Sequence, residues 1–248
     1  MRWRKSNEVS VDEENPYWMS FSDMMSALLV IFILAAVILI LQLMERQKDF
    51  DQKVSLLEQA EQVRRTILDE AVDELRQRGI KVEVSENHTV LRIPNALLGF
   101  DTGAYEVLPR YQPTALEIGE VINKVISKEH RVDFLDTIFI EGHTDNRPYN
   151  NAQIKGNWGL STFRAISLWQ FWSSELPEAE RLNRLNNQDG DPLFSVSGYG
   201  ETRPVNDQQS SEDDYRLNRR IDIRFTIRRP LSAEYEGVRE MLGGGAAK

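Results

Sequence analysis

The chain has 248 residues and a formal net charge of −9. This acidic balance argues against direct nucleic-acid binding, because phosphate backbones select basic surfaces. The sequence contains no cysteine, which excludes structural disulfides, thiol catalysis and cysteine-based zinc sites.

The amino-terminal part predicts a short tail followed by one transmembrane helix. Residues 1–15 are charged and polar, as expected for a mobile tail. Asn15 can cap the helix, and Pro16 suits its first position. The run 24–44 has no charged residue and is long enough to span a bilayer, which takes about 20 apolar residues. It is longer than the roughly 7–15 apolar residues of a cleaved signal peptide, so we expect the helix 16–44 to stay in the membrane.

Asp23 lies at the start of this apolar run. The aromatic pair Tyr17 and Trp18 suits the water–lipid boundary, which places Asp23 about 8 Å deeper at ~1.5 Å per residue. A carboxylate at that depth is costly and is a functional-site hypothesis by default. Alternatively, it is an ordinary charge flanking a signal anchor, stabilised by the positive end of the helix dipole. Its position alone leaves both interpretations open.

Residues 45–79 predict a helical connector that ends at Gly79. Its apolar residues recur with helical spacing in two groups, separated by a polar stretch. These residues are Phe50, Val54 and Leu57, then Leu68, Val72 and Leu75. The connector is expected to pair with its twin in a homodimer. The alternative is a solvated linker whose last two turns dock on the following domain.

Residues 80–230 alternate strand and helix patterns. The expected elements are a hairpin of strands 81–84 and 90–93, a helix over 113–127, a strand over 137–141, a helix over 160–172, and strands over 194–197 and 221–227. The pattern predicts an α+β sandwich with helices packed on one face of a mixed sheet. The segment 183–191 is polar enough for a surface loop, and 231–248 is expected to be a flexible tail.

Two polar loops attract attention in this domain. Residues 142–148 follow a predicted strand, and residues 157–165 open the next helix, so both gather at one end of the sheet. Asp145 offers an acceptor for an ammonium group, and Arg164 offers a planar fork for a carboxylate. Held apart, they form a receptor for a zwitterionic amino-acid end group. Alternatively, Asp145 caps a turn and Arg164 pairs with it.

The motifs GHTDNRP, NWGLSTFRA, GYGETRPV and LNRRIDIRF occur in this order and together resemble the OmpA-like peptidoglycan-binding domain over residues 90–228. The resemblance implies a βαβαββ sandwich in which Asp145 and Arg164 bind the diaminopimelate of the cell-wall peptide. It implies supporting roles for Thr144, Asn157, Leu160 and Ser161. It also implies that Arg219 and Arg220 are mainly structural.

The amino-terminal motif YWMSFSDMMSA (17–27) is similar to the single membrane helix of MotB-type stator proteins, which begins with one aspartate. The basic, Pro/Gly-rich approach of flagellar stators is missing. The run PYWMSFSDMMSALLVIFIL is closer to the ZorB family of Zorya anti-phage systems. This resemblance implies a homodimer inside a pentameric MotA/ZorA-like ring, with Asp23 carrying protons. Ser22 and Ser26 could supply further oxygens, which leaves sodium open as the coupling ion.

The expected function is therefore a peptidoglycan-anchored, stator-like subunit of a proton-driven motor in the bacterial inner membrane, acting in anti-phage defence. The short amino terminus is expected in the cytoplasm and the larger domain in the periplasm. The alternatives are a flagellar stator subunit and a passive peptidoglycan tether without ion flow. An enzyme is the least expected class, because P-loop, GxSxG, HExxH and dinucleotide motifs are missing. The histidines (His88, His130, His143) lack paired metal-ligand spacing, and no cofactor or metal is expected.

Overall fold

The computed structural model describes residues 16–85, 87–100, 103–151 and 155–229. The chain divides into two compact units, Met1–Val54 and Ser55–Lys248. The Asn15 cap and the two expected tails, 1–15 and 231–248, lie outside the described residues.

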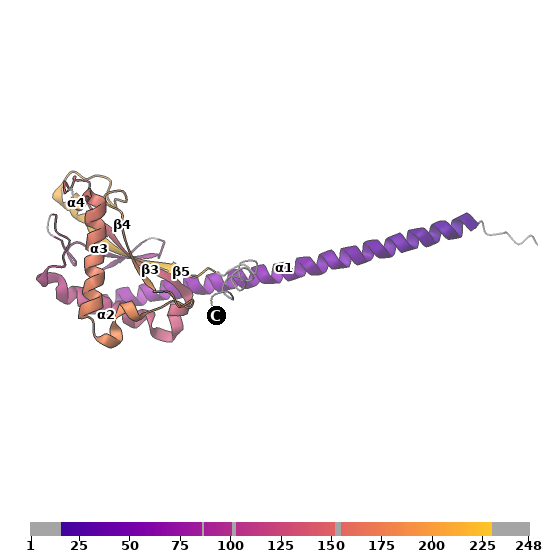
Figure 1. Ribbon diagram of the computed structural model, residues 1–248, viewed down its shortest axis with the longest axis horizontal. Coiled ribbons are helices and arrows are strands. Elements are labelled where there is room, and N and C mark those ends of the chain that lie inside the picture. Colours follow the sequence, from indigo (N-terminus) through magenta and orange to yellow (C-terminus); the bar gives the residue numbers. More distant parts are fainter. Residues whose placement is uncertain (1–15, 86, 101–102, 152–154, 230–248) are drawn as a thin grey trace, which may run out of the picture. The chain divides into compact units, whose positions relative to one another are not determined.

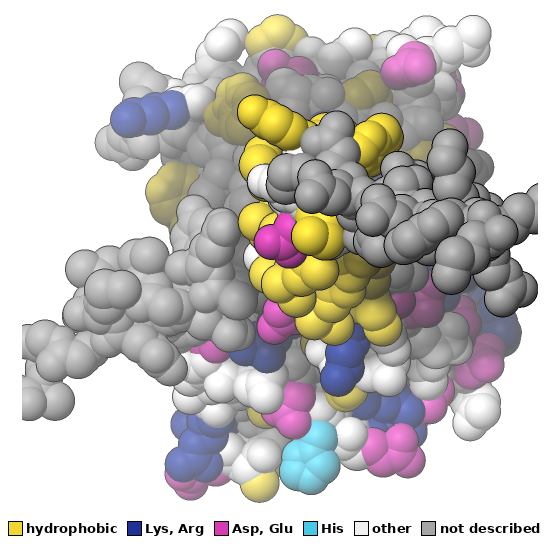
Figure 2. Space-filling model, turned by 90° about the vertical axis from the view of Figure 1, so that its right-hand side faces the viewer, with side chains coloured by type: hydrophobic (Ala, Val, Ile, Leu, Met, Phe, Trp, Pro, Cys, Tyr) yellow, Lys and Arg dark blue, Asp and Glu magenta, His cyan; other side chains and the backbone are white. Residues whose placement is uncertain are grey.

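The first unit is the amino-terminal part of helix α1 (Pro16–Gln77). Among the described residues, α1 is the one helix that is long and apolar enough to cross a membrane, which agrees with the expected span. Its large hydrophobic side chains are exposed from Tyr17 to Met44. Hydrophobic side chains gather near the centre of the face drawn in Figure 2. A helix that is hydrophobic all round needs lipid or other apolar surfaces around it, because exposing so much apolar surface to water is unfavourable.

The second unit contains a five-stranded mixed sheet in the order β1-β2-β5-β3-β4. The strands are β1 (Glu83–Val84), β2 (Val90–Pro94), β3 (Leu135–His143), β4 (Phe194–Gly198) and β5 (Arg220–Ile227). β3 and β4 run parallel, and the other neighbours are antiparallel. Every expected strand is present, and only β1 is shorter than expected.

The helices of this unit are the end of α1, α2 (Gln112–Ile126), α3 (Gly156–Glu175) and the short α4 (Glu212–Asn218). Short 3₁₀ segments lie at Pro109–Tyr111, Lys128–Phe134, Glu178–Glu180 and Leu182–Arg184, and the second of these is kinked at Glu129 and His130. α3 connects the parallel neighbours β3 and β4 and lies alongside both (Figure 1). The two expected helices are confirmed. The expected loop 183–191 is largely exposed, and Asn187 Oδ1 accepts the backbone N–H groups of Asp189 and Asp191 at its turn.

One face of the sheet is apolar and forms the core with the helices. Ile223 of β5 lies opposite Ile140 of β3 and Leu91 of β2, and all three are fully buried. Successive side chains of a strand point to opposite faces. The other face of β3 and β5 therefore carries charged residues, among them Glu141 and Asp222.

The end of α1 is part of this core. Ile67, Leu68, Ala71 and Leu75 are buried in the same cluster as the sheet and α2, so docking is the role observed for this part of the expected connector. Glu70, between these residues, accepts hydrogen bonds from Arg131 and Lys128, which lower the pKa of Glu70 to about 2. Apolar packing and ion pairs together fix this helix to the turn that follows α2.

Candidate functional site

The site begins where β3 ends and the chain turns away from the sheet. The backbone N–H of Thr144 donates to the Gly200 carbonyl oxygen (2.9 Å), which fixes the loop against the chain that follows β4. Asp145 comes next, and its side chain is only 8% exposed. Its Oδ1 accepts the backbone N–H of Arg147 at 3.1 Å, so Asp145 caps its own turn.

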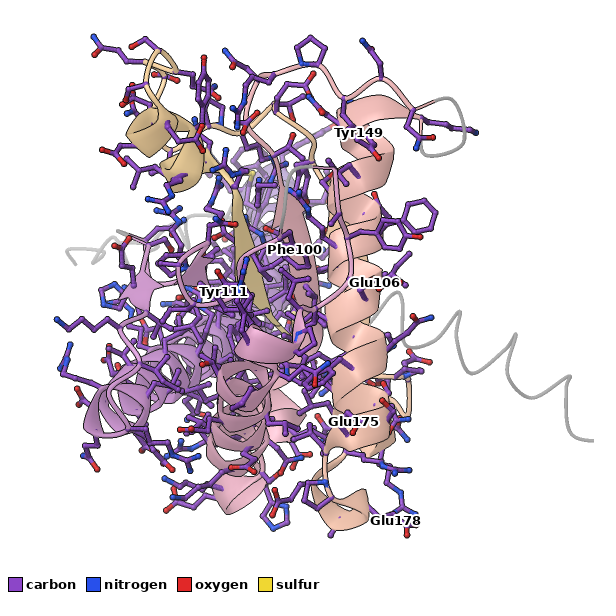
Figure 3. The ribbon with its side chains drawn as sticks, turned by 90° about the vertical axis from the view of Figure 1, so that its left-hand side faces the viewer. Phe100, Glu106, Tyr111, Tyr149, Glu175 and Glu178 are labelled. Atoms are coloured by element: carbon purple, nitrogen blue, oxygen red, sulfur yellow. The ribbon has the colours of Figure 1, made fainter. Side chains whose placement is uncertain are left out.

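The second half of the site lies on α3. Asn157 Nδ2, in the first turn, donates to the Arg147 carbonyl oxygen (3.0 Å) and so ties the helix to the loop. Arg164 is 3% exposed, its Nε donates to the Ala104 carbonyl oxygen (3.0 Å), and its guanidinium lies 5.0 Å from the ring centre of Phe100. Figure 3 shows Tyr149 at the amino-terminal end of α3, the end that faces this loop.

These groups enclose a pocket of about 140 Å³, which suits the end group of a ligand. Its lining residues are Gly103, Thr144, Asp145, Arg147, Pro148, Tyr149, Asn157, Leu160, Arg164 and Arg219. Of the predicted binding residues, Ser161 alone does not line the pocket. It is fully buried, its hydroxyl oxygen accepts the Gly200 N–H (2.9 Å), and its hydroxyl group donates to the Trp158 carbonyl oxygen. Ser161 therefore links α3 to the chain that follows β4.

The pocket carries one carboxylate among three guanidinium groups. Burial favours the neutral acid, but hydrogen bonds from Arg147 and Arg219 outweigh it and hold the pKa of Asp145 below its ordinary value. Burial, and next the charge of Arg219, lowers the pKa of Arg164 to about 10. Both groups are therefore ionised at neutral pH. The positive excess favours a ligand that brings a carboxylate.

Thr144 adds a polar group that the chain leaves unsatisfied. Its Oγ1 is buried and has no hydrogen-bond partner among the described residues, although Thr144 lines the pocket. A buried hydroxyl without a partner costs about 1–3 kcal/mol, which a ligand group can recover. Thr144 therefore offers a hydroxyl group to a ligand in the pocket, and its supporting role stays a prediction.

The two arginines of the NRR motif, for which a mainly structural role stays a prediction, have different surroundings. Arg219 lines the pocket, and its Nη1 donates to Asp145 Oδ2 at 2.6 Å. Arg220 is buried on the charged face of the sheet, where its Nε donates to Asp222 Oδ2 at 3.0 Å. Arg147 and Tyr149 line the pocket as well but were not expected there. Their only sequence signal is their closeness to Asp145.

A second cluster of ionisable groups covers the charged face of the sheet. Ligand atoms of Glu141, His143 and Asp222 lie within 4.8 Å of one another. The Glu141 carboxylate binds Arg224 (2.7 Å), and Asp222 binds Arg220 (3.0 Å), so guanidinium groups already neutralise both acids. This donor set does not favour a cation. His143 ends β3, and its ring faces this cluster rather than the pocket of Asp145.

His143 is expected to make the fold sensitive to mild acid. Burial, and next the charges of Arg220 and Arg203, lowers its pKa from 6.5 to about 2. Below about pH 6.5, His143 therefore binds a proton in the unfolded chain but stays neutral in the folded chain. The free energy of unfolding falls as the pH drops below this value. Between about pH 6.5 and 5 the loss should be about 1.5 kcal/mol. Urea unfolding of the full chain in detergent, followed by near-ultraviolet circular dichroism, measures it.

The control for this prediction is His143→Gln, which removes the titrating group. Its stability should be nearly independent of pH across the same window, whatever its absolute value. The depressed carboxyl groups stay ionised there in both states, because their ordinary pKa values lie at about 4. An equal pH dependence in both proteins would contradict the assignment to His143.

Comparison with known proteins shows which proteins this chain and its fold resemble. Residues 99–218 match the sequence model of the OmpA family. The structure is similar to that of a putative MotB-like protein from Desulfovibrio vulgaris, with 21% identity, a TM-score of 0.50, and coverage of 70% of this chain and 99% of that chain. The expected fold class, an apolar amino-terminal helix and a helical region followed by an OmpA-like α/β domain, is confirmed.

Two curated relatives come from Bacillus subtilis (strain 168). The chain is 27% identical over 151 residues to Motility protein B, covering 61% of this chain and 50% of the relative. It is 30% identical over 138 residues to the uncharacterized protein YtxE, covering 56% of this chain and 48% of the relative. The chain therefore spans about half the length of the curated relatives it matches.

Proposed function

We propose that this chain is a stator-type subunit of an ion-driven motor in the bacterial inner membrane, anchored to peptidoglycan by its OmpA-like domain. The observation that carries the proposal is the pocket, in which a buried carboxylate and a buried guanidinium line one small cavity. This charge pair suits the free end of diaminopimelate, where an ammonium group and a carboxylate share one carbon. The similarity to Motility protein B supports the motor class.

The wall-binding half of the proposal predicts a loss of peptidoglycan binding in Asp145→Asn and in Arg164→Gln. Each change leaves one ligand charge unpaired in a desolvated pocket, so binding to purified diaminopimelate-type sacculi should fall at least tenfold. Co-sedimentation of the full-length protein in detergent with sacculi measures it. Arg184→Gln, at a side chain 60% exposed and outside the pocket lining, is the matched control. Unchanged binding of both pocket variants would reject the site.

In the membrane half of the proposal, two copies of the chain pair their α1 helices inside a pentameric ring of MotA/ZorA-like subunits. Asp23 is the one acid in the apolar part of α1, and proton binding would remove its charge and change the ring surface it prefers. The amino terminus is assigned to the cytoplasm and the OmpA-like domain to the periplasm. Co-purification with a multi-helix membrane subunit in mild detergent separates this arrangement from a passive tether, which needs no such partner.

For the output of the motor we propose anti-phage defence, on the resemblance of residues 16–34 to the ZorB family. Deletion of the gene should then raise the efficiency of phage plating and leave swimming unchanged. Loss of swimming would assign the chain to flagellar motility instead. Helicase or nuclease genes beside the gene for the ring subunit would support defence.

A further inference from the structure

The carboxylate of Asp145 is already fully engaged within the chain. Oδ1 accepts bonds from the backbone N–H (3.1 Å) and Nε (3.2 Å) of Arg147. Oδ2 accepts bonds from Nη2 of Arg147 (2.7 Å) and Nη1 of Arg219 (2.6 Å). An ionised carboxylate offers about four lone-pair positions, and these bonds fill them. A ligand ammonium group therefore has to replace one of the donors.

The exposure of the two arginines indicates which donor gives way. The Arg147 side chain is 43% exposed, whereas that of Arg219 is 12% exposed. Arg219 also binds Glu212 at 2.5 Å from its buried position. Arg147 thus lies on the solvent side of Asp145, where an incoming ligand meets it first.

Arg147 also contacts helix α4 in the same side-chain position. Its Nη1 donates to Glu212 Oε2 (3.1 Å), and its guanidinium lies 4.3 Å from the ring centre of Tyr215. Both partners belong to α4 (Glu212–Asn218). If the guanidinium leaves Asp145, it can keep these contacts on α4, which offsets part of what the exchange loses.

We propose that Arg147 is an internal competitor of the ligand, which occupies Asp145 in the free protein and yields to the ammonium group of the ligand. This inference rests on the proposed function, because it concerns the same pocket. When only a fraction of the protein is competent to bind, the apparent affinity is reduced by that fraction. Arg147 therefore lowers the affinity for ammonium-bearing ligands and excludes weaker cations from Asp145.

The opposite role for Arg147 would be to hold the ligand carboxylate, and the two roles predict opposite effects of its removal. A competitor raises affinity when it is removed, whereas a ligand contact lowers it. Two small probes separate the roles further. meso-Diaminopimelate carries ammonium groups, and pimelate has the same carbon chain and carboxylates without them.

The experiment titrates both probes into the full-length protein in detergent micelles and follows binding by ligand-observed NMR. Arg147→Gln is expected to bind meso-diaminopimelate at least threefold more tightly than the unmodified protein, with no gain in the binding of pimelate. Arg147→Lys, which keeps the charge but loses the fork, should fall between the two proteins. Arg216→Gln removes an exposed guanidinium of α4 outside the pocket lining, so it controls for the change in overall charge.

The outcomes distinguish this inference from the proposed function. Weaker or unchanged binding of meso-diaminopimelate by Arg147→Gln overturns the competitor role, while wall binding stands as long as Asp145→Asn still loses it. Equal gains for both probes also overturn it, because pimelate has no ammonium group that could replace Arg147 at Asp145. Failure of the unmodified protein and of Arg147→Gln to bind meso-diaminopimelate and sacculi overturns the proposed function itself.

Discussion

Asp23→Asn is expected to abolish the ion-driven activity of the assembled complex and to leave its assembly intact. Asparagine has nearly the same shape as aspartate but cannot take up and release a proton near neutral pH. The substitution also removes a charge from an apolar helix, so insertion into the membrane should not suffer. Purification with the ring subunit tests assembly, and phage plating or swimming tests activity.

The physical reason to expect so large an effect is that, under the proposed function, a single side chain carries the coupling. A membrane potential supplies ~2.3 kcal/mol for each elementary charge that moves through 100 mV, and a side chain that binds and releases a proton can couple that charge movement to a conformational change. Glu45→Gln is the matched control, because it makes the same acid-to-amide change just outside the apolar run 24–44 and should keep activity. If Asp23→Asn keeps full activity, the proton-carrier role is wrong and the tether alternative gains support. Activity that requires sodium would instead identify sodium as the coupling ion.

Gly142→Ala is expected to destabilise the OmpA-like domain by at least about 3 kcal/mol, the upper end for overpacking. Gly142 pairs in register with Gly198 on the neighbouring strand, beneath the first turns of α3. A Cβ at Gly142 would overlap the Ser161 carbonyl group and lie 2.7 Å from its carbon atom. This is backbone inside a helix, so it cannot rotate away. Denaturant unfolding of the full chain in detergent measures the loss.

The matched control is Gly190→Ala, at a loop glycine with φ of +85° and open space around the position of a Cβ. It should lose only the conformational advantage of glycine, about 1 kcal/mol. The contrast matters for function, because Gly142 sets how closely α3 approaches β3 and thereby how far Arg164 lies from Asp145. A mild effect of Gly142→Ala would mean that α3 can shift away from the sheet.

The sequence predicts well those elements whose hydrophobic pattern matches the burial of their side chains in the fold. The apolar run after Asp23 is long enough to span a bilayer, and α1 contains it as one continuous helix. Strand β5 alternates because one of its faces lies on the core and the other on the charged cluster. Asp145, Asn157 and Arg164 were predicted together because each follows a strand end or opens a helix, which brings them to one end of the sheet.

Other features depend on contacts that local pattern does not contain. Arg219 and Arg220 are neighbours of the same type, and only the assembled sheet assigns one to the pocket and the other to Asp222. Helix α4 was missed although its signal is present. The capping box of Ser211 and Asp214 marks its start, but the helix is too short for a hydrophobic period to appear. The docking of residues 67–75 depends on the apolar surface of α2 and the sheet, whose residues lie far away in the sequence.

The burial of α1 residues from Ile67 to Leu75 has a mechanical consequence for any device that is moored to the cell wall. A tether of loose chain would stretch before it transmitted force. Residues 67–75 of α1 are instead part of the core of the second unit. A pulling force on this segment is resisted by its buried side chains and by the hydrogen bonds from Arg131 to Glu70. A force applied to residues 67–75 therefore acts directly on the folded core of this unit.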